Sequence, residues 1–191
     1  MMGSFLSALH SFISLLSRPF AMKDLGDLHY FLDVQVTHSS AGLFLFQYKY
    51  TSNLLRKFHM HTCKPVRTPS AARTTLSLSN GELLIDPTEC RSMVGALQYL
   101  TMTRPDIAYA VHVVSQFMHA PRTIHLLAAK RILRYLQGTL DHGILLRSAA
   151  VPSLVVAYSD AEWAGCRDSY RSTTGYAVFF GPNLIAWRLK K

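Results

Sequence analysis

Negative charge is scarce in this sequence. Eleven acidic side chains stand against 20 basic ones, so the formal net charge is +9 and the pI is near 9.7. The excess is spread along the chain as +4 in residues 1–70, +3 in 71–140 and +2 in 141–191. Such a surface fits a polyanionic partner, because each neutralised phosphate releases bound counterions. The same composition also fits a basic protein that has no such partner.

Cysteines and long apolar runs are scarce as well. The three cysteines are widely spaced and form no Cys-x-x-Cys pair, which argues against a disulfide framework and indicates a reducing compartment. No apolar run is long enough to cross a bilayer, so no membrane partner is expected. Charged residues make up only 16% of the chain and hydrophobic ones 49%, which excludes global disorder and allows an apolar core.

The first 23 residues have two interpretations. They are rich in serine and contain no acidic side chain before Asp24, as in an organellar transit peptide. They also fit an ordinary helix with an apolar face made of Leu9, Phe12, Ile13, Leu16 and Phe20. The compartment is therefore left open, with an organelle as one possibility.

The next segments predict a hairpin and then a loop. β-branched and aromatic residues favour strands over 29–36 and 42–50, joined by the polar turn 37–42. A helix is expected over 51–60. Three prolines and an Asn-Gly pair between residues 64 and 87 predict a poorly ordered linker over 64–85.

From Asp86 the apolar period changes to 3.6 residues. Asp86 is the expected N-cap, with Pro87 at the first helical position. One face of this helix is apolar (Met93, Val94, Leu97, Leu100), and the opposite face carries Arg91, Gly95 and Tyr99. Arg104-Pro105-Asp106 starts a second helix with an apolar side of Ile107, Val111, Val114 and Met118. A third helix, from about 124 to 137, gathers Lys130, Arg131 and Arg134 on one side.

After residue 142 the pattern returns to strands. Residues 153–163, 172–181 and 183–188 predict three consecutive antiparallel strands. The expected fold class is α/β (α+β). Its parts are a hairpin with flanking helices (1–63), the linker (64–85), a three-helix subdomain (86–140) and the strands (141–191).

Four collinear segments carry a family resemblance. MKDLGDLHYFLDVQV (22–36) with GLFLFQYKY (42–50) resembles the last palm segment of the reverse transcriptase in copia-type retrotransposon polyproteins. The segments 91–121 and 125–146 resemble the thumb of that polymerase. The segment YSDAEWAGCRDSYRSTTGYAVFFGPNLIAWRLKK (158–191) resembles the opening of the RNase H domain. Together they span nearly the whole chain in the order of that family.

For the polymerase part, the resemblance implies a nucleic-acid site without the metal-binding pair. The family's Tyr-x-Asp-Asp motif does not occur here, and polymerisation needs two divalent ions on paired carboxylates. The hairpin resembles the element that grips the primer terminus, with Phe31-Leu32-Asp33 where the family usually has Phe-Leu-Gly. An aspartate there would repel a primer phosphate. Two ordinary packed strands are the alternative interpretation of the hairpin.

The resemblance also implies which residues bind nucleic acid. The Arg91, Gly95 and Tyr99 face resembles the thumb helix that lies in the minor groove of the primer–template, so the expected partner is RNA–DNA hybrid or duplex. Lys130, Arg131 and Arg134 are candidate phosphate contacts. Spacing alone favours a solvated helix surface for the first face, and the resemblance reverses that preference.

In the RNase H segment, Asp160 matches the first of four family carboxylates that bind two Mg²⁺ ions. Glu162 shares a strand face with Asp160 but stands where the family has Asp, and the second family carboxylate is expected beyond Lys191. One carboxylate is not expected to hold Mg²⁺. An ordinary strand carboxylate is the alternative interpretation of Asp160.

Other chemistry is not indicated. His59-x-His61-x-Cys63 does not have a zinc spacing, and no nucleophile motif predicts a small-molecule substrate. The sequence therefore predicts a fragment of a reverse transcriptase/RNase H that is catalytically inactive as it stands. The alternatives are a non-catalytic nucleic-acid-binding protein derived from a retroelement and an enzyme subunit completed by another chain.

Overall fold

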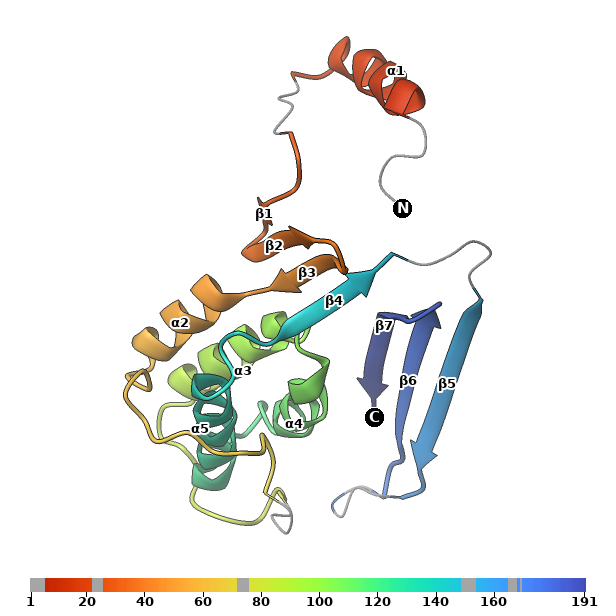
Figure 1. The fold of residues 1–191 in the computed structure, drawn as a ribbon. Coiled ribbons are helices and arrows are strands. Elements are labelled where there is room, and N and C mark those ends of the chain that lie inside the picture. The colour runs from red at the N-terminus through yellow and green to blue at the C-terminus, as the bar shows by residue number, and fades with distance from the viewer. Residues whose placement is uncertain (1–5, 22–25, 72–75, 149–153, 165–167, 169) are drawn as a thin grey trace.

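The computed structural model describes residues 6–21, 26–71, 76–148, 154–164, 168 and 170–191. These residues form a mixed α/β fold with five helices and two antiparallel sheets (Figure 1). The helices are α1 (Leu6–Ser17), α2 (Tyr48–Lys57), α3 (Thr88–Leu100), α4 (Pro105–Ser115) and α5 (Thr123–Gln137). The strands are β1 (Tyr30–Phe31), β2 (Val34–Ser39), β3 (Gly42–Phe46), β4 (Gly143–Arg147), β5 (Val155–Glu162), β6 (Thr173–Phe180) and β7 (Asn183–Lys190).

The first sheet has the order β1-β2-β3-β4. Strands β2 and β3 form the predicted hairpin, from Gln35 opposite Phe46 to Ser39 opposite Gly42. The predicted strand 29–36 is interrupted by a tight turn at Leu32 and Asp33, so that β1 folds back onto β2. This turn lies at the edge of the sheet.

Strand β4 belongs to a different sheet from the one that the sequence predicted. The sequence grouped residues from 141 onward with the C-terminal strands, whereas β4 pairs with β3 along five residues, from Gly42 opposite Arg147 to Phe46 opposite Gly143. The physical reason is the open edge of the hairpin. β4 supplies backbone partners for β3 along that edge.

Helix α2 begins earlier than predicted. The two tyrosines among residues 48–50 predict a continuation of the second strand, but α2 starts at Tyr48. The Gln47 carbonyl accepts the backbone N–H of Thr51 at 2.9 Å, which is a helical bond. The helix also buries Leu54 and Leu55 in the core. This burial outweighs the strand preference of the tyrosines, because that preference depends on context.

The three predicted helices α3, α4 and α5 surround the main core. Their predicted apolar residues are confirmed as buried, among them Met93, Leu97 and Ile107, each 0% exposed. Met118 is only half-buried, because α4 ends at Ser115. α3 begins at Thr88, one residue later than predicted, and the Asp86 carboxylate accepts the Thr88 N–H at 2.9 Å.

The segment 64–85 is irregular, as predicted, but its described parts are fastened to α5. The Val66 N–H donates to the Arg134 carbonyl. Glu82 and Thr123 form two hydrogen bonds. The Glu82 N–H donates to the Thr123 Oγ1, and the Thr123 N–H donates to the Glu82 carbonyl. The expectation of a poorly ordered linker is therefore wrong for residues 64–71 and 76–85, and residues 72–75 lie outside the described chain.

The second sheet has the order β5-β6-β7, which confirms three consecutive antiparallel strands. It is attached to the rest of the molecule through β7. The Asn183 side chain bonds the backbone of Arg147 through both its oxygen (2.7 Å) and its nitrogen (2.9 Å). The Trp187 indole N–H donates to the Thr101 carbonyl at 3.1 Å, and β7 lies beside α4 (Figure 1).

Helix α1 stands apart from the rest of the fold in Figure 1. Its predicted apolar face is not covered, since Phe12 and Phe20 are 57% and 63% exposed and Ile13 and Leu16 are half-buried. The side chain of Leu9 lies outside the described set. None of the described helices is long and apolar enough to cross a membrane.

Candidate nucleic-acid interface

Helix α3 presents Arg91, Gly95 and Tyr99 opposite its buried face. Arg91 and Gly95 are exposed and Tyr99 is half-buried. A Cβ added at Gly95 would meet nothing within 4 Å, so the helix surface is bare there. This bare stretch allows the backbone of a ligand to approach closely.

Arg91 also has a structural role that the sequence did not reveal. Its guanidinium donates to the carbonyls of Met118 and His119, both at 2.9 Å. These bonds fix the turn that follows α4 and use two of the five guanidinium N–H groups. The other N–H groups can still point to a phosphate.

Tyr99 joins the helix to the sheet. Its hydroxyl donates a hydrogen bond to the carbonyl of Leu32, and its ring meets that of Tyr50 edge-on, with centroids 5.1 Å apart. The predicted helix face and the predicted hairpin are therefore in direct contact, through two residues that lie 67 positions apart in the chain. The sequence predicted both features but not the bond between them.

The turn that Tyr99 holds has an unusual backbone. Leu32 and Asp33 have φ angles of 47° and 59°, in the left-handed region that favours glycine. This conformation accounts for the glycine that the resembled family usually has at position 33. Here the Tyr30 hydroxyl donates to the Asp33 carboxylate at 2.6 Å, which stabilises the turn and raises the pKa of Tyr30. The tip carries Phe31 and Leu32, 60% and 63% exposed.

The basic cluster on α5 contacts a different part of the chain. Arg131 donates to the Thr68 hydroxyl and Arg134 to the Lys64 carbonyl, both at 2.9 Å. Both arginines therefore hold the segment 64–68 against the helix. The half-buried Lys130 is the member of the cluster that makes no hydrogen bond or ion pair among the described residues.

Asp160 lies on β5, exposed and opposite Gly175 of β6. Its carboxylate accepts the N–H of Ala161 at 2.9 Å. Glu162 shares this sheet face, but within the described residues no group of three or more His, Cys, Asp or Glu side chains could hold a metal ion. These two carboxylates do not fit a two-metal site, and His59, His61 and Cys63 form no metal cluster either.

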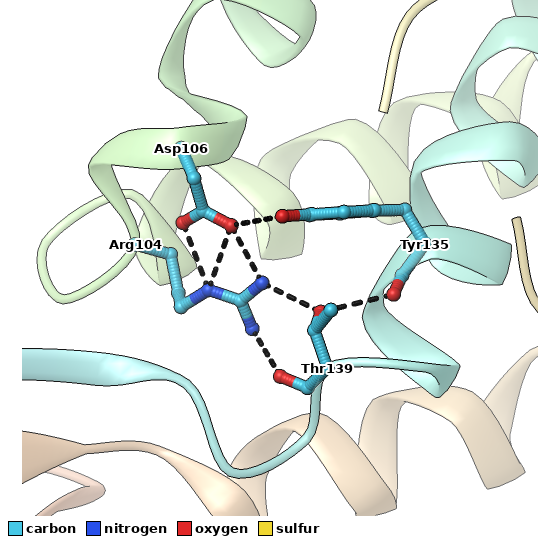
Figure 2. Close-up of polar contacts among 4 residues, drawn as sticks. All are labelled: Arg104, Asp106, Tyr135 and Thr139. Atoms are coloured by element: carbon cyan, nitrogen blue, oxygen red, sulfur yellow. Dashed lines mark hydrogen bonds and ion pairs between the residues drawn. The ribbon is translucent and has the colours of Figure 1, made fainter. Parts of the chain in front are cut away.

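Arg104 and Asp106 belong to a buried polar network that no pattern in the sequence predicts. Arg104 is 2% exposed and forms an ion pair with Asp106 at 2.7 Å (Figure 2). It also donates to the Thr139 carbonyl at 2.8 Å and the Thr139 hydroxyl at 2.7 Å, while the Tyr135 hydroxyl donates to Asp106 at 2.9 Å. The start of α4 is thereby tied to the end of α5.

Arg104 keeps the carboxyl group of Asp106 ionised. Burial acts to raise the pKa of Asp106, but the hydrogen bonds and the charge of Arg104, with the Tyr135 hydroxyl, outweigh burial and lower it. Asp106 is therefore ionised at neutral pH. The network fixes how the start of α4 packs against the end of α5.

Comparison with known proteins shows a match to a protein family. Residues 1–72 match the family model described as reverse transcriptase (RNA-dependent DNA polymerase). No solved structure matches the chain.

Three relatives cover almost the whole chain. The Retrovirus-related Pol polyprotein from transposon RE1 of Arabidopsis thaliana is 52% identical over 96% of this chain and 12% of its own length. The corresponding polyprotein from transposon TNT 1-94 of Nicotiana tabacum is 38% identical over 92% of this chain and 14% of its own length. The Uncharacterized mitochondrial protein AtMg00810 of Arabidopsis thaliana is 45% identical over 99% of this chain and 78% of its own length.

This chain thus spans about an eighth of the Pol polyproteins that it matches. The matches run through both the hairpin region and the helices that carry the α3 face. The chain belongs to the copia-type retrotransposon polyproteins, as a fragment of a Pol protein that contains a reverse transcriptase.

Proposed function

We propose that this chain binds RNA–DNA hybrid or duplex nucleic acid, without sequence preference, through one surface made of Phe31, Leu32, Arg91, Gly95 and Tyr99. We name it the thumb–turn surface. The observation that carries the proposal is the hydrogen bond from Tyr99 to the Leu32 carbonyl, because it makes one continuous surface from the two elements that the family uses to hold a primer–template.

Each part of the thumb–turn surface has a chemical role. Gly95 lets the sugar–phosphate backbone approach the helix, Arg91 donates to a phosphate, and the exposed Phe31 and Leu32 pack on sugars. Lys130 adds a phosphate contact from α5, whereas Arg131 and Arg134 mainly position the segment 64–68. The net charge of +9 adds a long-range attraction.

A charge placed at Gly95 tests this proposal. Gly95→Glu is expected to weaken the binding of a short RNA–DNA hybrid about tenfold or more, because the carboxylate both blocks close approach and repels phosphate. Fluorescence anisotropy at two salt concentrations measures the effect. Wild-type affinity should fall by about 0.9 log units per log unit of salt for each phosphate neutralised.

The matched control is Asn53→Glu, which adds the same carboxylate to an exposed site on α2. A Cβ at position 95 meets no other atom, so Gly95→Glu should fold, and circular dichroism checks both variants. Equal losses in the two variants would reduce the proposal to a non-specific charge effect. Absence of hybrid binding by the wild-type chain would refute it.

For the C-terminal part, we propose that β5–β7 is the opening of an RNase H-like domain with Asp160 as its first carboxylate. The palm-related part is then residues 1–63 together with β4, and the thumb is residues 86–140. Supporting this division, β4 pairs with β3 and the last three strands form their own sheet. In the family, Mg²⁺ activates the attacking oxygen and stabilises the leaving one. Asp160 and Glu162 alone do not make its site.

The chain by itself is therefore expected to be inactive. With Mg²⁺ or Mn²⁺, we expect neither template-dependent nucleotide incorporation nor cleavage of the RNA strand of a hybrid, because both reactions need more carboxylates than the described residues bring together. A primer-extension assay and a labelled-hybrid assay measure the two activities, each with Asp160→Asn as control. Incorporation that survives Asp160→Asn would contradict the polymerase half, and RNA cleavage abolished by Asp160→Asn would contradict the other.

A further inference from the structure

The sheet β5-β6-β7 separates acidic from basic side chains. Residues paired across antiparallel strands point to the same face, and neighbours along a strand point to opposite faces. Asp160 and Glu162 therefore share one face with Tyr158. Arg188 is paired with Tyr176, and Lys190 with Thr174, on the other face. We name the second face the basic face.

The basic face has an exposed aromatic ring at its centre. Tyr176 is 44% exposed and lies between Ser159 on β5 and Arg188 on β7, both exposed. In the next row, Thr174 lies between Ala161 and Lys190. All residues of the three strands are described, and the basic face contains no acidic side chain.

We propose that the basic face binds single-stranded RNA or DNA, with a base stacked on Tyr176 and phosphates held by Arg188 and Lys190. This goes beyond the proposed function, since it is a second site for another form of nucleic acid. A sheet face with an exposed ring and cations beside it suits unpaired bases, because each base has a face free to stack. The opposite face is unsuited, because Asp160 and Glu162 repel phosphates.

The position of the cations supports this partner. Adjacent strands lie about 4.8 Å apart and alternate residues of one strand about 7 Å apart. Arg188 is therefore beside the Tyr176 ring, and Lys190 is one step further along the same strand. A single nucleic-acid strand that runs parallel to β7 can stack one base on the Tyr176 ring while its phosphates lie beside Arg188 and Lys190.

The sheet offers its own matched control, because it has one exposed tyrosine on each face. Tyr176→Ala is expected to weaken the binding of fluorescein-labelled twelve-nucleotide rU and dT about tenfold, the loss expected for one stacked base. Tyr158→Ala, at a tyrosine 64% exposed on the acidic face, should leave the affinity unchanged. Tyr176→Trp should retain binding, since an indole also stacks.

Two further variants keep the ring and decide the result if Tyr176→Ala fails to fold. Arg188→Gln and Lys190→Gln should each lower the salt dependence of single-strand binding by about 0.7 log units per log unit of salt. Equal losses in Tyr176→Ala and Tyr158→Ala, or unchanged salt dependence in both glutamine variants, would overturn the proposal. Gly95→Glu separates the two sites: it should weaken hybrid binding and spare the single-stranded oligonucleotides.

Discussion

Arg104→Met is expected to lower the free energy of unfolding by about 3 kcal/mol, because it leaves the partly buried carboxylate of Asp106 without its counter-charge. The substitution also removes the donors to the carbonyl and hydroxyl of Thr139. Both losses fall where the start of α4 meets the end of α5 (Figure 2), and Tyr135 packs there against the main core. Urea denaturation followed by circular dichroism measures the change.

Arg104→Lys serves as the control. It keeps the positive charge but loses the planar arrangement of donors that reaches Asp106 and Thr139 together, so its loss should be smaller than that of Arg104→Met but clearly measurable. Equal stability of Arg104→Met and the wild type would show that the network adds nothing to the fold.

The pH dependence follows from the same network. Because the folded pKa of Asp106 is lowered, its contribution is fully present above the ordinary carboxyl value of 3.8 and is lost as the pH falls through the folded pKa below it. In Arg104→Met this lowering disappears. Unfolding experiments between neutral and acid pH should therefore show a smaller loss of stability below 3.8 in the variant than in the wild type.

Gly42→Ala is expected to destabilise the first sheet by about 3 kcal/mol. Gly42 has φ +133°, and a Cβ there would lie 2.0 Å from the Leu146 carbonyl oxygen, which belongs to the backbone of β4. The strand cannot yield without breaking its pairing with β3. Thermal or urea unfolding measures the loss, and intrinsic tryptophan fluorescence reports whether Trp187 stays packed against the helices.

Gly95→Ala is the matched substitution with the opposite sign. Gly95 is within α3, its φ is ordinary, and a Cβ has open space, so alanine should raise stability by about 0.5–1 kcal/mol. If Gly42→Ala and Gly95→Ala lowered the stability by similar amounts, the loss in Gly42→Ala would reflect a general sensitivity to substitution and not the geometry at Gly42.

The sequence by itself determined the local elements and their buried faces. The 3.6-residue period predicted which side of α3 is buried, because a helix repeats side-chain direction at that period. Alternating and β-branched residues predicted the hairpin and the last three strands. The exposed position of Arg91 and Gly95 followed from the same pattern.

Only the tertiary structure decided which distant elements meet. The residues of β4 carry no local signal that they pair with β3 rather than with β5, since an open strand edge accepts any suitable strand. The hydroxyl of Tyr99 could have faced solvent or a ligand, and its bond to Leu32 depends on how α3 packs beside the first sheet. Arg131 and Arg134 likewise looked free on a helix face, but the folded chain lays the segment 64–68 across them. Periodicity records the direction of a side chain within its element, whereas its partner is set by contacts between residues far apart in the chain.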